Sequence, residues 1–470
     1  MQANFDALFK PKSVAVIGAS DNNGKLGFHV MSSLIDGGFP GRVAPVNPKG
    51  GEIMGRAVFP SLSEVQGDVD LAMIVLPASL VPAQIQACAA KGVRGVILIT
   101  AGFKEIDDSS GADLEAEVVR LANEAGIPII GPNTFGLVNP HLPLNASFTP
   151  SLSQVKKGGV AIISQSGGLA SLVALLAMKA NIGLSKIVGL GNRCNVDFAD
   201  LLEWIVKDPQ TKAIALYMEG IDDPHRFLGE IKRLNPQKPM IIYKTGRSEV
   251  ADMACRSHTG SLAGRHEFYK AGFRQAGLLS VQNSEDLLDG ARALAVCPPP
   301  QGPRVAILSA QAGLAITSCD ACAVNGLEIG PFSPQTQERI NDTLPPLALR
   351  TNPVDMGPGW YNLTAMRKIL RAVMEDERVD GILLFMLSSE ANVAAINELS
   401  GLIMEWGQKK PLLTCFSSPP GIWDAEVRRL EEAEAIVNYP TPERAARALA
   451  LLNKRRLVLE RTSNKEAGAQ

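Results

Sequence analysis

Short apolar runs alternate with helical stretches along most of the chain, and this alternation restricts the fold more than any other feature. In the N-terminal part the apolar runs are Val14–Ile17, Arg42–Val46, Leu71–Leu76, Gly95–Thr100 and Ile127–Ile130. Strands that alternate with helices form parallel sheets with helices packed on their faces. The sequence therefore predicts a parallel, doubly wound α/β domain in this part.

The pattern stops and restarts twice. After a polar, proline-bearing passage over 139–157, the next apolar runs are Gly159–Ile163, Lys186–Gly189, Ala213–Tyr217 and Met240–Tyr243. The run Cys297–Pro303 then brings several prolines, which lack an amide hydrogen and disfavour helix in the preceding residue, so we expect a linker there. The last strand-like runs are Arg304–Leu308, Gly381–Phe385 and Pro411–Thr414, before a charged helix at Pro442–Val458.

We therefore expect three α/β domains, over residues 1–138, 139–296 and 304–461. A chain of 470 residues is longer than one hydrophobic core usually serves. Aromatic residues make up only 5% of the chain, so the cores should be mainly aliphatic, as is typical of buried parallel sheets.

Charge and hydropathy argue against two classes of function. The formal net charge is -2, and we find no basic stripe of the kind that nucleic-acid binding requires. No uninterrupted apolar run of about 18 residues could span a bilayer, and Met1–Lys12 lacks the pattern of a signal peptide. We therefore expect a cytoplasmic protein that binds neither nucleic acid nor a membrane.

The seven cysteines lie scattered in apolar contexts and do not suggest a disulfide framework. Cys319 and Cys322 have the C-x-x-C spacing of redox and metal sites, but Leu314–Val324 has the pattern of a buried helix, and no second ligand pair lies nearby. We favour the core interpretation and expect no metal site in this chain.

One internal repeat relates the second and third domains, because Val160–Ala170 and Val305–Ala315 have similar sequences. Each is a strand followed by small residues and a helix, and the free amides at a helix start bind anions. The alternative is that both are ordinary strand-to-helix turns. On the anion hypothesis, the phosphate-holding positions are Ser166, Gly167, Gly168, Ala312 and Gly313.

A glycine-containing segment, Gly18–Gly27, follows the first strand directly and precedes a helix, where Rossmann-type domains receive a pyrophosphate. The G-x-G-x-x-G fingerprint is absent, and Asn47 and Lys49 stand where an acid would bind the ribose of NAD. Lys25 and Lys49 suit a ligand with additional phosphates, such as CoA. Alternatively, both lysines are merely solvated.

Further loops follow the later strands of this domain, at the carboxyl edge where open α/β sheets bind ligands. Taken together, the expected cofactor-binding residues are Gly18, Ala19, Ser20, Lys25, Gly27, Asn47, Lys49, Pro77, Ala78, Thr100, Gly102 and Asn133.

A histidine lies within Ser257–Gly264, a stretch of small and hydroxyl residues that suggests a flexible loop able to approach an oxyanion. Neutral imidazole can attack phosphorus, so His258 is a candidate phosphohistidine. Glu219 follows a strand of the same domain and could accept a hydrogen bond from one ring nitrogen. The alternatives are a structural histidine and a glutamate that only caps a loop.

These residues resemble the nucleoside-diphosphate-forming acyl-CoA synthetases, relatives of the succinyl-CoA synthetase α subunit, over nearly the whole chain. The motifs that carry the resemblance occur in the family's order: Gly18–Ser20, Pro45–Lys49, Gly131–Asn133, Ser164–Gly168, Tyr217–Gly220, Ser257–Gly260 and Thr351–Asp355. One departure is Ser309–Gly313, where the family commonly has more glycines, so Gln311 and Ala312 would weaken or reshape that half of the phosphate site.

The resemblance implies a Rossmann-like CoA-binding domain followed by two flavodoxin-like, succinyl-CoA synthetase-like domains. It also implies that acyl-CoA and phosphate are interconverted with acyl phosphate and CoA, and that His258, supported by Glu219, relays the phosphoryl group. ATP or ADP with Mg²⁺ would bind an ATP-grasp β subunit in an α2β2 assembly, and a small carboxylic acid would be the substrate. The alternatives are a non-catalytic CoA-binding or redox-sensing protein and a nicotinamide-dependent dehydrogenase.

Overall fold

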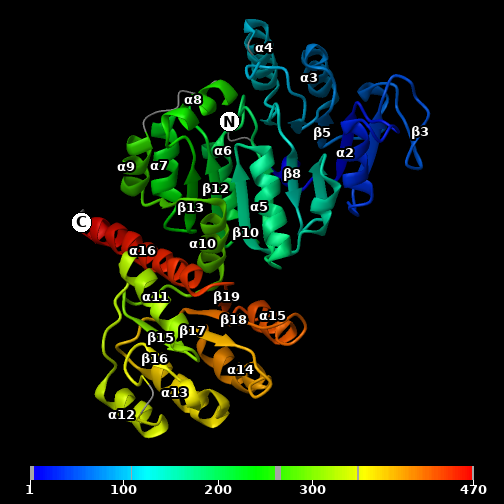
Figure 1. Ribbon diagram of the computed structural model, residues 1–470. Coiled ribbons are helices and arrows are strands. Elements are labelled where there is room, and N and C mark those ends of the chain that lie inside the picture. Colours follow the sequence, from blue (N-terminus) through cyan, green and yellow to red (C-terminus); the bar gives the residue numbers. More distant parts are fainter. Residues whose placement is uncertain (1–4, 107, 260–265, 347–348, 468–470) are drawn as a thin grey trace. The chain divides into compact units, whose positions relative to one another are not determined.

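The computed structural model describes residues 5–106, 108–259, 266–346 and 349–467. The chain divides into two compact units, 1–287 and 288–470. Figure 1 shows the first unit in blue to green and the second in yellowish green to red. Within the described ranges, no helix is both long enough and apolar enough to cross a bilayer.

The first sheet of the N-terminal unit is parallel throughout. Its strands, in spatial order, are β2 (Arg42–Val46), β1 (Ser13–Ile17), β5 (Leu71–Ile74), β6 (Gly95–Leu98) and β7 (Ile129–Ile130). Further elements of this region are α1 (Asp6–Phe9), α2 (Leu26–Ile35), the β3–β4 hairpin (Glu52–Ile53 and Arg56–Ala57), α3 (Val81–Lys91) and α4 (Ser109–Ala125). All five predicted strands are present.

Successive strand residues of the first sheet face opposite sides, and both sides are buried. Ala15 and Ile17 of β1 pack in one cluster with apolar residues of α3 and α4. Val14 and Val16 face the other way, into a second cluster with Val30 of α2. That second cluster continues into the core of the next sheet, so the two sheets share one hydrophobic core.

The second sheet, mostly green in Figure 1, mixes parallel and antiparallel strands. Its order is β14 (Leu279–Val281), β13 (Met240–Lys244), β12 (Ala213–Met218), β10 (Lys157–Ser164), β11 (Leu184–Gly189), β8 (Gly136–Asn139) and β9 (Leu144–Ser147). Its helices are α5 (Gly167–Lys179), α6 (Phe198–Lys207), α7 (Pro224–Leu234), α8 (Glu249–Thr259) and α9 (His266–Ala276).

The antiparallel edge was missed in the sequence, where 139–157 looks like a polar passage. β8 pairs antiparallel with β11 and with β9. Leu144 and Ala146 of β9 enter the shared core. The polar residues Asn145 and Ser147 alternate with these two and are buried as well, and the Ser147 hydroxyl donates to Asn145 Oδ1 at 2.6 Å. Because these buried residues are polar, the sequence pattern did not indicate a strand here.

The C-terminal unit contains one parallel sheet. Its order is β16 (Val354–Asp355), β15 (Val305–Ser309), β17 (Gly381–Leu387), β18 (Leu412–Ser417) and β19 (Val437–Asn438). The helices are α10 (Ser284–Val296), which begins just before the unit, α11 (Ala312–Val324), α12 (Pro334–Thr343), α13 (Leu363–Glu375), α14 (Ala395–Trp406), α15 (Asp424–Glu432) and α16 (Pro442–Ala467).

The last helix runs to Ala467 instead of ending at Val458, because no proline or glycine interrupts it and Arg456 pairs with Glu460 one turn later at 2.6 Å. Cys319 and Cys322 lie on α11 as free thiols, and burial raises the pKa of Cys322 to about 12. A thiol held protonated in this way suits packing better than metal or redox chemistry.

Candidate active site

A pocket of about 410 Å³ opens in the N-terminal unit between loops of the first sheet and the start of α5. Its walls are Leu26, Ile99, Thr100, Ala101, Asn133, Thr134, Phe135, Phe148, Gln165, Ser166, Gly167, Gly168, Ser171, Gly191 and Asn192. None of these residues carries a charge. The pocket therefore combines neutral hydrogen-bond donors with apolar surface.

The donors at one wall come from the first turn of α5. Ser166 is the N-cap residue, and its hydroxyl accepts a hydrogen bond from the Leu169 amide at 3.3 Å. The amides of Gly167 and Gly168 have no carbonyl earlier in the helix to bind. A Cβ added to Gly168 would meet only the Ser166 hydroxyl, at 3.9 Å. This helix start therefore has room for an anion, and phosphate binding there stays a prediction.

The related helix start in the C-terminal unit differs. Gln311 is the N-cap residue of α11, and its side chain makes no capping hydrogen bond. Ala312 and Gly313 follow in the first turn and are exposed. The serine that caps α5 thus corresponds to a glutamine at α11, and a weakened or reshaped half-site stays a prediction.

The glycine-containing segment of the first sheet requires its glycines. Gly18 adopts φ +94°, and a Cβ on it would lie 2.3 Å from the Val75 carbonyl oxygen. Gly27 lies in the first turn of α2, where an added Cβ would lie 2.1 Å from the Gly18 carbonyl oxygen. These contacts draw β1 and α2 together, as in Rossmann-type phosphate sites.

Asn47, Ala19 and Ser20 shape this segment through hydrogen bonds. The Asn47 side-chain amide donates to the Ala19 carbonyl at 2.9 Å, and the Ser20 hydroxyl accepts from the Asn22 amide at 3.1 Å. Lys25 and Lys49 are exposed, and neither has an ion-pair partner in the described parts of the chain. Two unneutralised ammonium groups near this segment suit a ligand with several phosphates.

The loops after β5, β6 and β7 also lie together. The Thr100 hydroxyl donates to the Leu76 backbone carbonyl at 2.6 Å, and the Asn133 backbone amide donates to the Thr100 backbone carbonyl at 2.7 Å. Pro77 and Ala78 begin the turn after β5, and a Cβ on Gly102 would lie 3.4 Å from the Ala78 Cβ. The structure thus brings the predicted loops to one edge, and Thr100 and Asn133 reach the same pocket as Ser166, Gly167 and Gly168.

Glu219 lies just after β12 and is buried. Its backbone amide donates to Gln165 Oε1 at 2.8 Å, and its carboxylate lies 3.5 Å from the Tyr217 hydroxyl. Burial raises the pKa of Tyr217, so the phenol stays protonated and can donate to that carboxylate. Gln165, which lines the pocket, therefore connects it to the strand end that carries Glu219.

His258 is only partly described. Its backbone belongs to the last turn of α8, whereas the sequence suggests a loop; the helix continues because glycine first appears at position 260. The His258 side chain and residues 260–265 lie outside the described residues. The predicted contact between His258 and Glu219 therefore stays a prediction.

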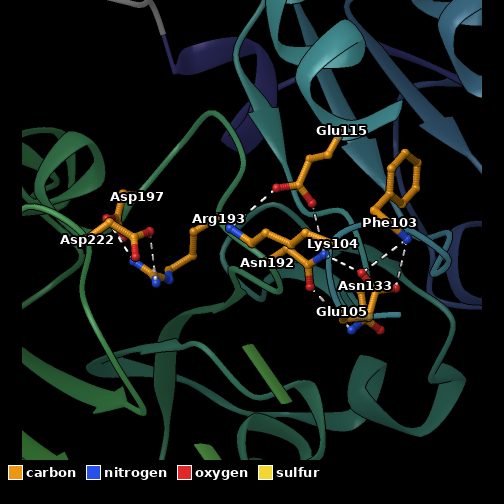
Figure 2. A network of polar contacts seen from close by, with 9 residues as sticks. All are labelled: Phe103, Lys104, Glu105, Glu115, Asn133, Asn192, Arg193, Asp197 and Asp222. Carbon is orange, nitrogen blue, oxygen red and sulfur yellow. Dashed lines mark hydrogen bonds and ion pairs between the residues drawn. The ribbon is translucent and has the colours of Figure 1, made fainter. Parts of the chain in front are cut away.

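A polar network beside the pocket was missed in the sequence (Figure 2). The side-chain amide of Asn192 donates to the Glu105 carboxylate at 2.5 Å and to the Glu115 carboxylate at 3.1 Å. Its side-chain oxygen Oδ1 accepts from the side-chain amide of Asn133 at 3.4 Å. Lys104 pairs with Glu115 at 3.3 Å. The loop after β6 is thereby joined to the loop after β11, and Asn192 also lines the pocket.

Arg193 continues this connection toward the second sheet (Figure 2). Its guanidinium is fully buried and binds Asp197 at 2.9 Å and Asp222 at 3.3 Å. Asp222 follows Glu219 closely along the chain. The signal that sequence analysis could have used is the polar pair Asn192–Arg193 just after β11, at the carboxyl edge where ligands bind.

Glu105 stays ionised at the centre of the network. Burial opposes its ionisation, but hydrogen bonds from Asn192 and from the amides of Gly102 and Phe103 outweigh that effect and hold the pKa of Glu105 below its usual value. A charged carboxylate with several donors is a stable anchor for the loop it belongs to.

Comparison with known proteins agrees with this geometry. Residues 12–140 match the model of a CoA binding domain, and residues 157–294 match that of a succinyl-CoA ligase like flavodoxin domain. The α subunit of acetate–CoA ligase (ADP-forming) I from Pyrococcus furiosus is 38% identical over 459 residues, which cover 96% of this chain and 97% of that subunit. The chain belongs to the ADP-forming acyl-CoA synthetase family.

Two further members of this family are informative. A solved acetyl-CoA synthetase from Ca. Korarchaeum cryptofilum, in complex with phosphate and ADP, superposes with a TM-score of 0.88 at 34% identity and covers 98% of this chain. Acetate–CoA ligase (ADP-forming) I from Archaeoglobus fulgidus is 36% identical, but the match covers only 63% of it. The chain thus corresponds to an α subunit, which implies a second subunit.

Membership in the ADP-forming acyl-CoA synthetase family confirms the predicted fold class and identifies the protein as an acid–thiol ligase. The alternatives of a non-catalytic or redox-sensing protein and of a nicotinamide-dependent dehydrogenase do not fit a family of CoA ligases.

Proposed function

We propose that this chain is the α-type subunit of an ADP-forming acyl-CoA synthetase and that the pocket at the start of α5 is where acyl-CoA and phosphate are interconverted with acyl phosphate and CoA. The observation that carries this proposal is the convergence, in one pocket, of the loops of the CoA-binding sheet and the open amides of Gly167 and Gly168.

In the first step, a phosphate oxygen attacks the carbonyl carbon of the thioester, the C–O bond forms, and the C–S bond breaks to release CoA as the thiol after protonation. Phosphate must be held against the thioester for this step, and the helix start with Ser166, Gly167 and Gly168 suits that task. The apolar wall formed by Phe135, Phe148 and Ile99 offers room for the acyl group of a small carboxylic acid.

In the second step, a neutral ring nitrogen of His258 attacks phosphorus, and the carboxylate leaves. A carboxylate hydrogen-bonded to the other ring nitrogen favours the nucleophilic tautomer. Glu219 is the candidate, since it is buried and lies on the strand end linked to the pocket by Gln165.

The remaining assignments concern CoA and the partner. Lys25 and Lys49 are the positive charges proposed to hold CoA phosphates, beside the segment that begins at Gly18. ADP and Mg²⁺ are assigned to an ATP-grasp β subunit in an α2β2 assembly. The solved relative with phosphate and ADP bound supports the use of both ligands in this type of enzyme.

The test is transfer of phosphate to the protein. The chain and its partner subunit are incubated with radiolabelled ATP, and acid-labile, base-stable label on the α chain is measured. We expect label on the wild type and none on His258→Ala. The control is His225→Ala, because His225 is exposed on α7. Label that persists on His258→Ala at the wild-type level would refute the relay.

A further inference from the structure

Gln165 is a buried side chain with two different ends. The residue follows β10 directly, and only 4% of its surface is exposed. Its side-chain oxygen Oε1 accepts two hydrogen bonds, from the backbone amides of Glu219 at 2.8 Å and Gly220 at 3.1 Å. Among the residues that the structure describes, no acceptor lies within hydrogen-bonding distance of its Nε2.

The two backbone amides determine which way this amide group is turned. An N–H donor needs an available lone pair, and only Oε1 offers one, because the lone pair of the amide nitrogen is delocalised into the carbonyl group. Exchanging Oε1 and Nε2 would place donors against donors at both contacts. Nε2 must therefore present its two hydrogens away from Glu219 and Gly220, where none of the described residues accepts them.

A buried donor without an acceptor costs free energy, so its persistence calls for an acceptor from outside the chain. Gln165 lines the pocket together with Ser166, Gly167 and Gly168, its neighbours in sequence. Among the described residues, those that line the pocket carry no cation, so the donors that they offer to an anion are neutral. An oxyanion has lone pairs in several directions and can accept from Nε2 and from the helix amides together.

We infer that Gln165 Nε2 donates a hydrogen bond to an oxygen of the phosphoryl group, as inorganic phosphate or as acyl phosphate, when it occupies this pocket. This inference rests on the proposed function. It adds a side-chain ligand to the backbone donors of the α5 start. Because Oε1 holds the Glu219 and Gly220 amides, the same residue also positions the phosphoryl group relative to the Glu219 strand end.

The experiment compares Gln165→Glu with the wild type in the complex with the partner subunit. Glutamate has the same shape and keeps one oxygen for the two backbone amides, but when ionised it replaces the donor with a negative charge. We expect the KM for phosphate to rise at least about tenfold at pH 8. The KM for CoA should stay within about twofold, since no contact with CoA is assigned to this residue.

The pH profile separates a ligand contact from a structural role. A protonated glutamic acid can again donate to phosphate while accepting from the two amides, and burial favours that neutral form. The phosphate KM of Gln165→Glu should therefore fall back toward the wild-type value as the pH is lowered from 8 to 6. Gln154→Glu, an exposed substitution, is the control and should follow the wild type at every pH.

Kinetics in the two directions of the reaction show whether Gln165 binds inorganic phosphate, acyl phosphate or both. If acetyl phosphate and CoA replace acetyl-CoA and phosphate, a raised KM for acetyl phosphate assigns the bond to the phosphoryl group in both species. A raised KM for phosphate alone assigns it to the free anion. Gln165→Met, which removes the donor without adding charge, should raise the same constants.

Failure of the inference differs from failure of the proposed function. Isothermal titration calorimetry of the wild-type complex with inorganic phosphate gives the reference affinity. If the wild type binds no phosphate, both the proposed function and the role of Gln165 are wrong. If the wild type binds it and both variants, folded by circular dichroism, bind it equally well, only the role of Gln165 is refuted.

Discussion

Single residues explain why the segment between β1 and α2 tolerates little change. Gly27 and Gly18 approach so closely that a Cβ on Gly27 would lie 2.1 Å from a backbone oxygen. Backbone cannot move aside as the end of a side chain can, so any larger residue must push α2 away from β1. Glycine patterns of this kind could be recognised in the sequence, because their cause is local.

We predict that Gly27→Ala lowers the stability of the N-terminal unit by about 1–3 kcal/mol, as expected for an overpacked site. It should also weaken CoA binding, since the segment loses its shape. Urea unfolding and titration with CoA check both effects. Gly229→Ala on α7, where an added Cβ meets nothing within 4 Å, is the control and should not reduce stability or CoA affinity. Wild-type values for Gly27→Ala would contradict the packing argument.

Elements far apart in the sequence meet beside the pocket through the polar network. The loop after β6 provides Glu105, and the loop after β11 provides Asn192, which touches the pocket. No spacing rule relates these two residues, because 87 positions separate them in the chain. Their contact depends on how the two sheets pack, and for that reason sequence analysis missed it.

The low pKa of Glu105 has a consequence for stability. A carboxylate whose pKa is lower in the folded state than in the unfolded state stabilises the fold above its unfolded pKa, and this contribution is lost as the pH falls through the folded pKa. We therefore predict that Glu105→Gln lowers the melting temperature at pH 7 and that the difference from wild type shrinks below about pH 4.

Thermal unfolding of both proteins between pH 7 and pH 3 tests this prediction. Glu124→Gln is the matched control, because Glu124 is exposed on α4, where its ion pair with Arg120 should contribute little to stability. A difference between Glu105→Gln and wild type that is constant over this pH range would show that the ionised form of Glu105 does not stabilise the fold.

At the scale of the whole molecule, each of the two compact units contains a hydrophobic cluster made of its own residues. One cluster extends from the first sheet into the second, with Val16 and Leu137 in the same core. The sheet of the C-terminal unit has its own cluster, which includes Leu384. Two sheets that share a core should unfold together, and a unit with its own core can unfold by itself.

We predict two calorimetric transitions for the chain alone. Leu137→Ala should lower the free energy of unfolding of the N-terminal unit by about 2–5 kcal/mol, so that its transition moves to a lower temperature. The transition of the C-terminal unit should stay at the wild-type temperature. Leu384→Ala should lower the transition temperature of the C-terminal unit and leave that of the N-terminal unit unchanged. Each variant serves as the control for the other. If either substitution shifted both transitions equally, the division into two cores would be wrong.

The sequence by itself determined the fold class, the order of the parallel strands along the chain, the glycine segment and the helix starts, because these follow from periodicity and from backbone geometry over a few residues. It also revealed the resemblance that identified the family. Only the tertiary structure decided that β8 and β9 form a buried antiparallel edge and that Asn192 contacts Glu105. It also decided that Gln165, at the pocket wall, has a donor with no acceptor among the described residues. Those features depend on contacts between distant segments, and the energy of a buried polar group depends on what surrounds it, which no local pattern of residues records.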